Sequence, residues 1–223
     1  MATSRADAAD ALAVLRAARR EPPASGPNHA AEAARDRATA IFRALDAGND
    51  AFFVECLEEA AAGLDAPNWE DEADVCLAIL DAIVGRRCPG AETVLERIAM
   101  HPHGTWLHGV VMVRMGRWDA ARFAPIMRKA ALTHPDEFVR ALAAEELVIA
   151  GQATPAELDA FLADASHDMR IHVSRGLAER GNPDAIRRLA PIALYPQKDE
   201  RWHEQANVLL RYLGVMPARG GSC

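Results

Sequence analysis

Three histidines lie within nine positions in HPHGTWLHG, residues 101–109, and they are the densest group that could bind a metal. Histidine is the commonest metal ligand in proteins, so a metal centre here would point to an enzyme. Two ligands on one helix usually lie four residues apart, as in H-E-x-x-H. His103 and His108 are five residues apart, which turns them about 140° from each other at 3.6 residues per turn. We therefore predict that these histidines hold no metal.

Other motifs that carry chemistry are missing from the sequence. It contains no P-loop, no G-x-G-x-x-G and no H-E-x-x-H, which are patterns with a known mechanism. No two cysteines form C-x-x-C, which argues against a zinc ribbon or a thioredoxin motif; they are Cys56, Cys76, Cys88 and Cys223. We predict no catalytic residue, no cofactor and no metal. An enzyme stays open, since a catalytic triad is spatial rather than sequential.

The composition favours an all-α protein. Half of the residues are hydrophobic but only 5% are aromatic, and alanine, which has the highest helix propensity, supplies much of the apolar content.

The net charge of −7 argues against a nucleic-acid partner, because such proteins usually present a basic face. No stretch approaches the ~20 apolar residues of a membrane span, and the first residues lack the apolar core of a secretory signal. We expect no membrane association and a cytoplasmic location.

An internal repeat organises the second half of the chain. The segments DEFVRALAAEELVIAG (136–151) and HDMRIHVSRGLAERG (167–181) align on their last glycine. Their apolar positions lie four residues apart, which keeps one face of a helix apolar, and the glycine suits the left-handed residue that ends a helix. The matching pairs are Val139 and Met169, Arg140 and Arg170, Ala143 and Val173, Leu147 and Leu177, and Gly151 and Gly181.

The same pattern predicts three further copies, which end at Gly85, Gly116 and Gly214. Segments with helical spacing lie between the copies, so we predict about five helix–turn–helix units, preceded by a helix at 28–47. We assign residues 28–214 to one repeat domain. Residues 1–27 are expected to form a short helix and a flexible Pro-rich linker, and residues 215–223 a flexible tail.

The second half of the chain resembles HEAT repeats. The helix VRALAAEEL follows HPDE and a helix with an internal proline, Pro125, and the same order returns with Pro191 before KDERWHEQANVLL. The resemblance covers roughly residues 50–214, and it looks most like the short-period HEAT-like repeats of bacterial proteins and phycobilin lyases. It implies a right-handed α-solenoid of about five HEAT-like helix pairs, in which the second helix of each pair lines the concave face.

In HEAT repeats, aspartate and arginine residues commonly form a ladder of charges that links neighbouring units. The resemblance implies this role for Asp136 with Arg140 and for Asp168 with Arg170, and it places Asp199 and His203 at the same point of the last unit. Two interpretations stay open. The charges form either a purely structural ladder or a polar stripe on a groove that binds a partner.

The resemblance and the missing motifs favour a non-catalytic module that binds or scaffolds another protein on its concave face, for example as an inhibitor or an immunity-type binder. A HEAT-like DNA glycosylase is one alternative, suggested by the tryptophans, and a bilin or prosthetic-group lyase is another. HEAT-like deoxyhypusine hydroxylases bind iron through repeated His-Glu pairs. This chain has one such pair, His203-Glu204, so that activity is not carried over.

Overall fold

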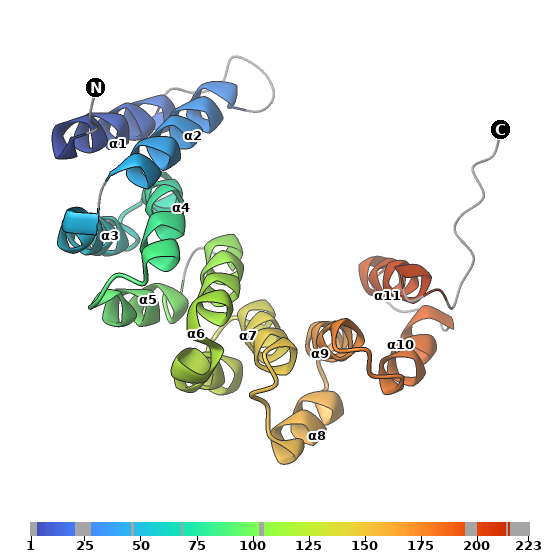
Figure 1. The fold of residues 1–223 in the computed structure, drawn as a ribbon. Helices are drawn as coiled ribbons and strands as arrows, with labels where there is room; N and C mark the ends of the chain where they lie inside the picture. The colour runs from blue at the N-terminus through green and yellow to red at the C-terminus, as the bar shows by residue number, and fades with distance from the viewer. Residues whose placement is uncertain are drawn as a thin grey trace. The chain divides into compact units, whose positions relative to one another are not determined.

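The structure, a computed structural model, describes residues 4–20, 28–45, 47–67, 69–102, 105–194, 200–212 and 214. Within the helices, the side chains of residues 105, 186, 191–194, 200–203 and 212 lie outside this set. Every regular element in the described residues is helical (Figure 1), which confirms the all-α prediction. The chain divides into two compact units, Met1–Asp119 and Ala120–Cys223.

Unit 1 contains two helix pairs and the start of a third. α1 (Arg5–Arg20) packs on α2 (His29–Ala44), and α3 (Asp50–Gly63), which follows the short 3-10 helix η1 (Ala47–Asn49), packs on α4 (Trp69–Arg86). α5 (Ala91–Ala99) lies against α3, and the first part of α6 (Thr105–Thr133) contacts α4 through an ion pair. The core is apolar and includes the fully buried side chains of Phe42, Phe53, Leu57, Ile79 and Ile83.

The N-terminal helix α1 is part of unit 1. It buries Ala8, Ala11, Leu12 and Leu15 on α2 and α4, and Arg16 donates hydrogen bonds to the carboxylate of Glu72 on α4. The sequence predicts a domain boundary at residue 28, but residues 5–20 pack on the helices that follow. The reason is the helical spacing of their small apolar side chains. The linker 21–27 and the segment 215–223 lie outside the described residues.

Unit 2 begins after a break inside α6. The helix continues through Gly116 and is interrupted at Asp119, where φ is −162° and ψ is 93°, so the two helices predicted on either side of this point are present. The remaining helices are α7 (Glu137–Ile149), α8 (Pro155–Ala163), α9 (His167–Glu179), α10 (Asp184–Leu194) and α11 (Glu200–Tyr212). α9 packs on α7, α8, α10 and α11, so it is the central helix of this unit.

The predicted buried positions and terminal glycines are present in two helices of unit 2, α7 and α9. The apolar positions of α7 and α9 are all buried, and they are Val139, Ala143, Leu147, Met169, Val173 and Leu177. The glycines that follow these helices have the predicted left-handed backbone, with φ of 69° at Gly151 and 72° at Gly181. Only glycine adopts this conformation without a steric cost, which explains why the pattern could be recognised from the sequence.

The pattern is shifted by two residues in α4. Gly85 lies inside the helix, and the left-handed residue is Arg87, with φ of 56°. The predicted alignment on Gly85 placed Leu77 and Asp81 on the buried stripe, and this is wrong because both are only partly buried. Counting back from Arg87 instead gives three fully buried side chains, Val75, Ile79 and Ile83.

Two glycine substitutions should therefore act in opposite directions. In Gly85→Ala the new Cβ meets no atom within 4 Å, and alanine is better than glycine inside a helix by about 0.5–1 kcal/mol. In Gly151→Ala the left-handed backbone disfavours any side chain by about 1–2 kcal/mol. We expect the free energy of unfolding in urea to rise in the first variant and to fall in the second. Shifts of the same sign in both variants would contradict the corrected alignment.

An arginine joins α6 to α8 within unit 2. Arg128 donates to the carboxylate of Glu157 and to the carbonyl oxygen of Gln152, at 3.0 Å. Glu157 also accepts from Thr154 and completes the predicted capping box at the start of α8. The hydrogen bond from Arg128, followed by those from Thr154, lowers the pKa of Glu157 from 4.5 to about 2.

This pKa predicts how acid affects unit 2. A carboxyl group whose pKa is lower in the folded state stabilises the fold fully above its unfolded pKa, and this stabilisation is lost as the pH falls through the folded pKa. The free energy of unfolding of the wild type should thus exceed that of Glu157→Gln most clearly above pH 4.5, and the difference should shrink towards pH 2. A difference that stays constant in urea titrations over this range would show that the carboxylate charge does not matter.

Candidate binding site

The predicted ladder residues of the first copy organise the turn before α7. Asp136 caps the helix by accepting hydrogen bonds from the backbone N–H groups of Phe138 and Val139, at 2.8 and 3.1 Å. Arg140 donates to the carbonyl oxygens of His134 and Pro135, at 2.9 and 3.2 Å. These contacts all lie within one turn. A ladder that links neighbouring units through these residues stays a prediction.

The other predicted ladder residues are only partly described. Asp168 is buried in the first turn of α9, where Ser166 is the helix cap, and Arg170 donates to His167 Nδ1 at 3.0 Å. Asp199 and the side chain of His203 lie outside the described residues. The structure thus places the four described residues at the starts of α7 and α9 rather than in one site.

Two of the three histidines in residues 101–109 are described, and both are buried. His101 is buried, with Nε2 at 3.0 Å from Asp65 Oδ1, and His108 is buried on α6. His103 lies outside the described residues. In the part of the chain that the structure covers, no three His, Cys, Asp or Glu side chains gather as a metal would require.

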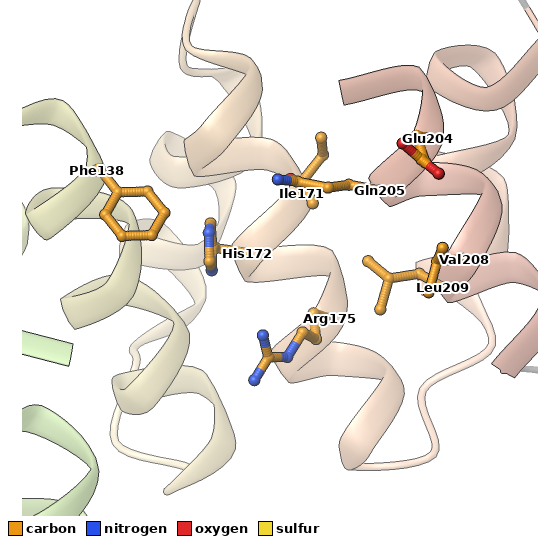
Figure 2. Close-up of a pocket in the computed structure, with 8 residues that line it drawn as sticks. All are labelled: Phe138, Ile171, His172, Arg175, Glu204, Gln205, Val208 and Leu209. Atoms are coloured by element: carbon orange, nitrogen blue, oxygen red, sulfur yellow. The ribbon is translucent and has the colours of Figure 1, made fainter. Parts of the chain in front are cut away.

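A cavity of about 490 Å³ lies between α7, α9 and α11. Figure 2 shows side chains from all three helices around it. Most of its exposed wall is apolar, although four of the eight lining residues are polar. The lining residues are Phe138, Ile171, His172, Arg175, Glu204, Gln205, Val208 and Leu209. Such a volume is typical of sites that hold a ligand or a few side chains of a partner, about 300–1,000 Å³.

A buried carboxylate fixes the polar part of this cavity. Glu145 is 2% exposed, and its Oε2 lies 2.6 Å from Nδ1 of the buried His172. Its Oε1 lies 2.7 Å from Nε of Arg175, but the N–H is not directed at this oxygen, so the contact is electrostatic rather than a hydrogen bond. The ring of Phe138 meets His172 edge-on, with centroids 5.2 Å apart. Glu145 thereby holds both His172 and Arg175 in place.

The side chains that line the cavity can bind apolar and charged groups. A histidine oriented by a carboxylate can act as a base when a nucleophile lies beside it. No serine, threonine or cysteine is among the residues that line the cavity in the described part of the chain. The apolar walls can bury apolar groups of a partner, and Arg175 and Glu204 can contact charged groups at the rim.

The three cysteines that the structure describes are poor nucleophiles. Burial raises the pKa of the Cys56 thiol to about 11 and that of the Cys88 thiol to about 12, and it also raises the pKa of the fully buried Cys76. A thiol acts as a nucleophile through its thiolate form. These three thiols are therefore protonated near neutral pH, and they pack as small apolar groups.

The carboxylates by which α4 and α7 pair with neighbouring helices lie at the same distance from the left-handed residue that follows each helix. This bridging position is the sixth residue before the left-handed residue, and it holds Asp81, Glu145, Arg175 and Val208. On α4, Asp81 accepts from Arg43 of α2 at 2.5 Å and lies 2.6 Å from Arg114 of α6. On α7, Glu145 reaches α9 in the same way. The repeat thus has inter-helix ion pairs, at a position that the sequence did not single out.

A second cavity, in unit 1, is also lined by a residue at the bridging position. A space of about 410 Å³ lies between α2 and α4, and its lining includes Arg35, Arg43 and Asp81. Two carboxylates line this cavity, Asp36 and Asp81, and Asp81 is paired with Arg43 and Arg114. At the bridging position of α11, by contrast, the cavity of unit 2 is lined by the apolar Val208.

Comparison of the chain with protein-family models, with curated proteins and with solved structures finds no match. None of the helices in the described part of the chain has the length and apolar character that crossing a bilayer requires. The functional assignment therefore depends on the geometry of the sites themselves.

The role of Glu145 can be tested by stability. Glu145→Ala removes the carboxylate between His172 and Arg175, and we expect a loss of about 3 kcal/mol in the free energy of unfolding, the lower end for breaking a buried ion pair, because Arg175 is half-exposed and can turn to water. The control is Glu179→Ala, which removes the exposed partner of Arg175 and should cost less than about 1 kcal/mol. Equal losses in the two variants would show that Glu145 does not organise the cavity.

Proposed function

We propose that this protein is a non-catalytic helical-repeat module that binds another protein through the groove of unit 2, defined by the cavity between α7, α9 and α11. The observation that carries the proposal is the open apolar wall at Val208, which is 53% exposed although it is a large hydrophobic residue and lines the groove. Exposed apolar surface with polar residues at its rim is typical of interaction sites.

The repeat supports this proposal. The recurring buried stripe, the left-handed residue and the bridging position fit helix pairs that stack as a right-handed α-solenoid of the short-period HEAT-like kind. In such a stack the second helices line one continuous face, and both cavities are lined by residues of second helices. A scaffold, an inhibitor or an immunity-type binder in the cytoplasm would use this face.

The groove argues against the alternative of a DNA-binding glycosylase. A phosphate backbone requires basic side chains that are available to it, but among the described side chains Arg175 is the one arginine that lines the groove, and it already faces Glu145 and Glu179. The tryptophans do not form a common surface on α6, since Trp118 is buried whereas Trp106 is 41% exposed. No residue of the groove favours a lyase.

A capture experiment tests the proposal. The tagged chain is purified from its host at low and at moderate salt, as the wild type, as Val208→Asp and as Val14→Asp. Val14 is the matched control, because it is 50% exposed and lies on α1 of unit 1. We expect one protein to accompany the wild type and Val14→Asp at both salt concentrations, and its yield to fall at least about tenfold with Val208→Asp, since a buried charge facing an apolar partner is costly.

Two outcomes would contradict the proposal. Equal capture of the same protein by Val208→Asp would show that the groove is not the binding site. Nucleic acid that is bound at low salt and lost at moderate salt would favour the DNA-binding alternative.

A further inference from the structure

The described side chains around the groove carry an excess of negative charge. Glu145 and Glu179 lie 2.7 and 3.6 Å from Arg175, and Glu204 lines the groove from α11. For these four side chains, one arginine and three glutamates, the formal net charge is 1 − 3 = −2. A carboxylate excess beside apolar walls attracts cations and repels anions, because field lines concentrate in a cleft with low-dielectric walls.

Glu204 is the charge that remains for a partner. Arg175 is held between two carboxylates of its own chain. Glu204 is exposed and forms no ion pair with any side chain that the structure describes. It stands one helical turn before Val208 on the same wall, so that a carboxylate and an exposed apolar side chain are neighbours (Figure 2).

The size of the groove limits what can enter it. The lining extends over residues 171–175 of α9 and 204–209 of α11, which is about 6–8 Å along each helix at 1.5 Å per residue. This length accommodates the side chains of a short segment but not the surface of a folded domain. The remainder of a stable interface, about 800 Å² on each partner, must then lie on the surrounding surface, with the groove as its anchor.

We infer that the groove of unit 2 binds a short segment of a partner protein that carries two apolar side chains next to a lysine or an arginine. The apolar side chains contact Ile171, Val208 and Leu209, and the basic side chain forms an ion pair with Glu204. This inference rests on the proposed function and adds the chemistry of the partner. The ion pair sets the orientation of the segment, because its basic end is attracted to Glu204.

A peptide-display selection tests the inference. A library of random 12-residue peptides is selected on the full-length wild-type chain, and the selected peptides are measured by calorimetry on the wild type, Val208→Asp, Glu204→Lys and the control Val14→Asp. All three substituted residues are exposed, so the variants are expected to fold, which their thermal unfolding checks. If Val208→Asp does not fold, Val208→Gln takes its place.

The expected peptides contain two apolar residues and a lysine or an arginine. Their affinity should be unchanged on Val14→Asp, at least about tenfold lower on Val208→Asp and about tenfold lower on Glu204→Lys, which corresponds to 1.4 kcal/mol. Replacing the basic residue of a selected peptide by glutamate should restore binding to Glu204→Lys and weaken binding to the wild type. This exchange of charge identifies Glu204 as the partner of the basic residue.

The failures of the inference and of the proposed function can be told apart. Acidic or uncharged peptides that lose affinity on Val208→Asp would overturn the inference and leave the groove as a protein-binding site. Basic peptides whose affinity is the same on Glu204→Lys would overturn the ion pair and so the inference. Peptides that bind equally well to Val208→Asp, or no selected peptides at all, would overturn both the inference and the proposed function.

Discussion

Burial of one apolar stripe on each second helix is the constraint on which the described structure depends. In α4, α7 and α9 the stripe consists of three side chains at intervals of four residues. In each helix they lie twelve, eight and four residues before a left-handed residue. The interval places these side chains on one face, and their burial removes the apolar surface of that face from water. The stripe also determines the direction of the other side chains, including those that reach the neighbouring second helix.

The bridging position relates the buried stripe to the groove that we propose as a binding site. It lies two residues before the last buried residue of the stripe, beside the neighbouring second helix. Asp81 and Glu145 use it to pair with arginines of adjacent helices, and such pairs specify which charges can approach each other. On α11 the same position holds Val208, which is half-exposed and cannot form an ion pair. On α11 the groove is therefore lined by Val208 next to Glu204, where α4 and α7 have a paired carboxylate.

The parts that were predicted from the sequence are those with a local physical cause. Gly151 and Gly181 could be recognised because a left-handed backbone favours glycine, and Leu147 and Leu177 follow from their distance to these residues. Arg87 was missed because it adopts the left-handed backbone without being glycine. The role of Glu145 could not be read from AAEEL either, since its partners His172 and Arg175 are brought to it by the packing of α9 on α7. The predicted ladder residues were chosen by resemblance; of the described ones, Asp136 caps α7 and Arg140 donates to the turn before it.

Methyl NMR on the chain with its captured partner tests the central claim most directly, namely that the groove of unit 2 is the binding site. Ile171, Val208 and Leu209 supply methyl groups that line the groove, and Val14 supplies a half-exposed methyl pair on α1 of unit 1. We predict that the partner shifts the resonances of the three groove residues and leaves those of Val14 in place. Unchanged groove resonances, with shifts confined to residues of unit 1, would contradict the claim.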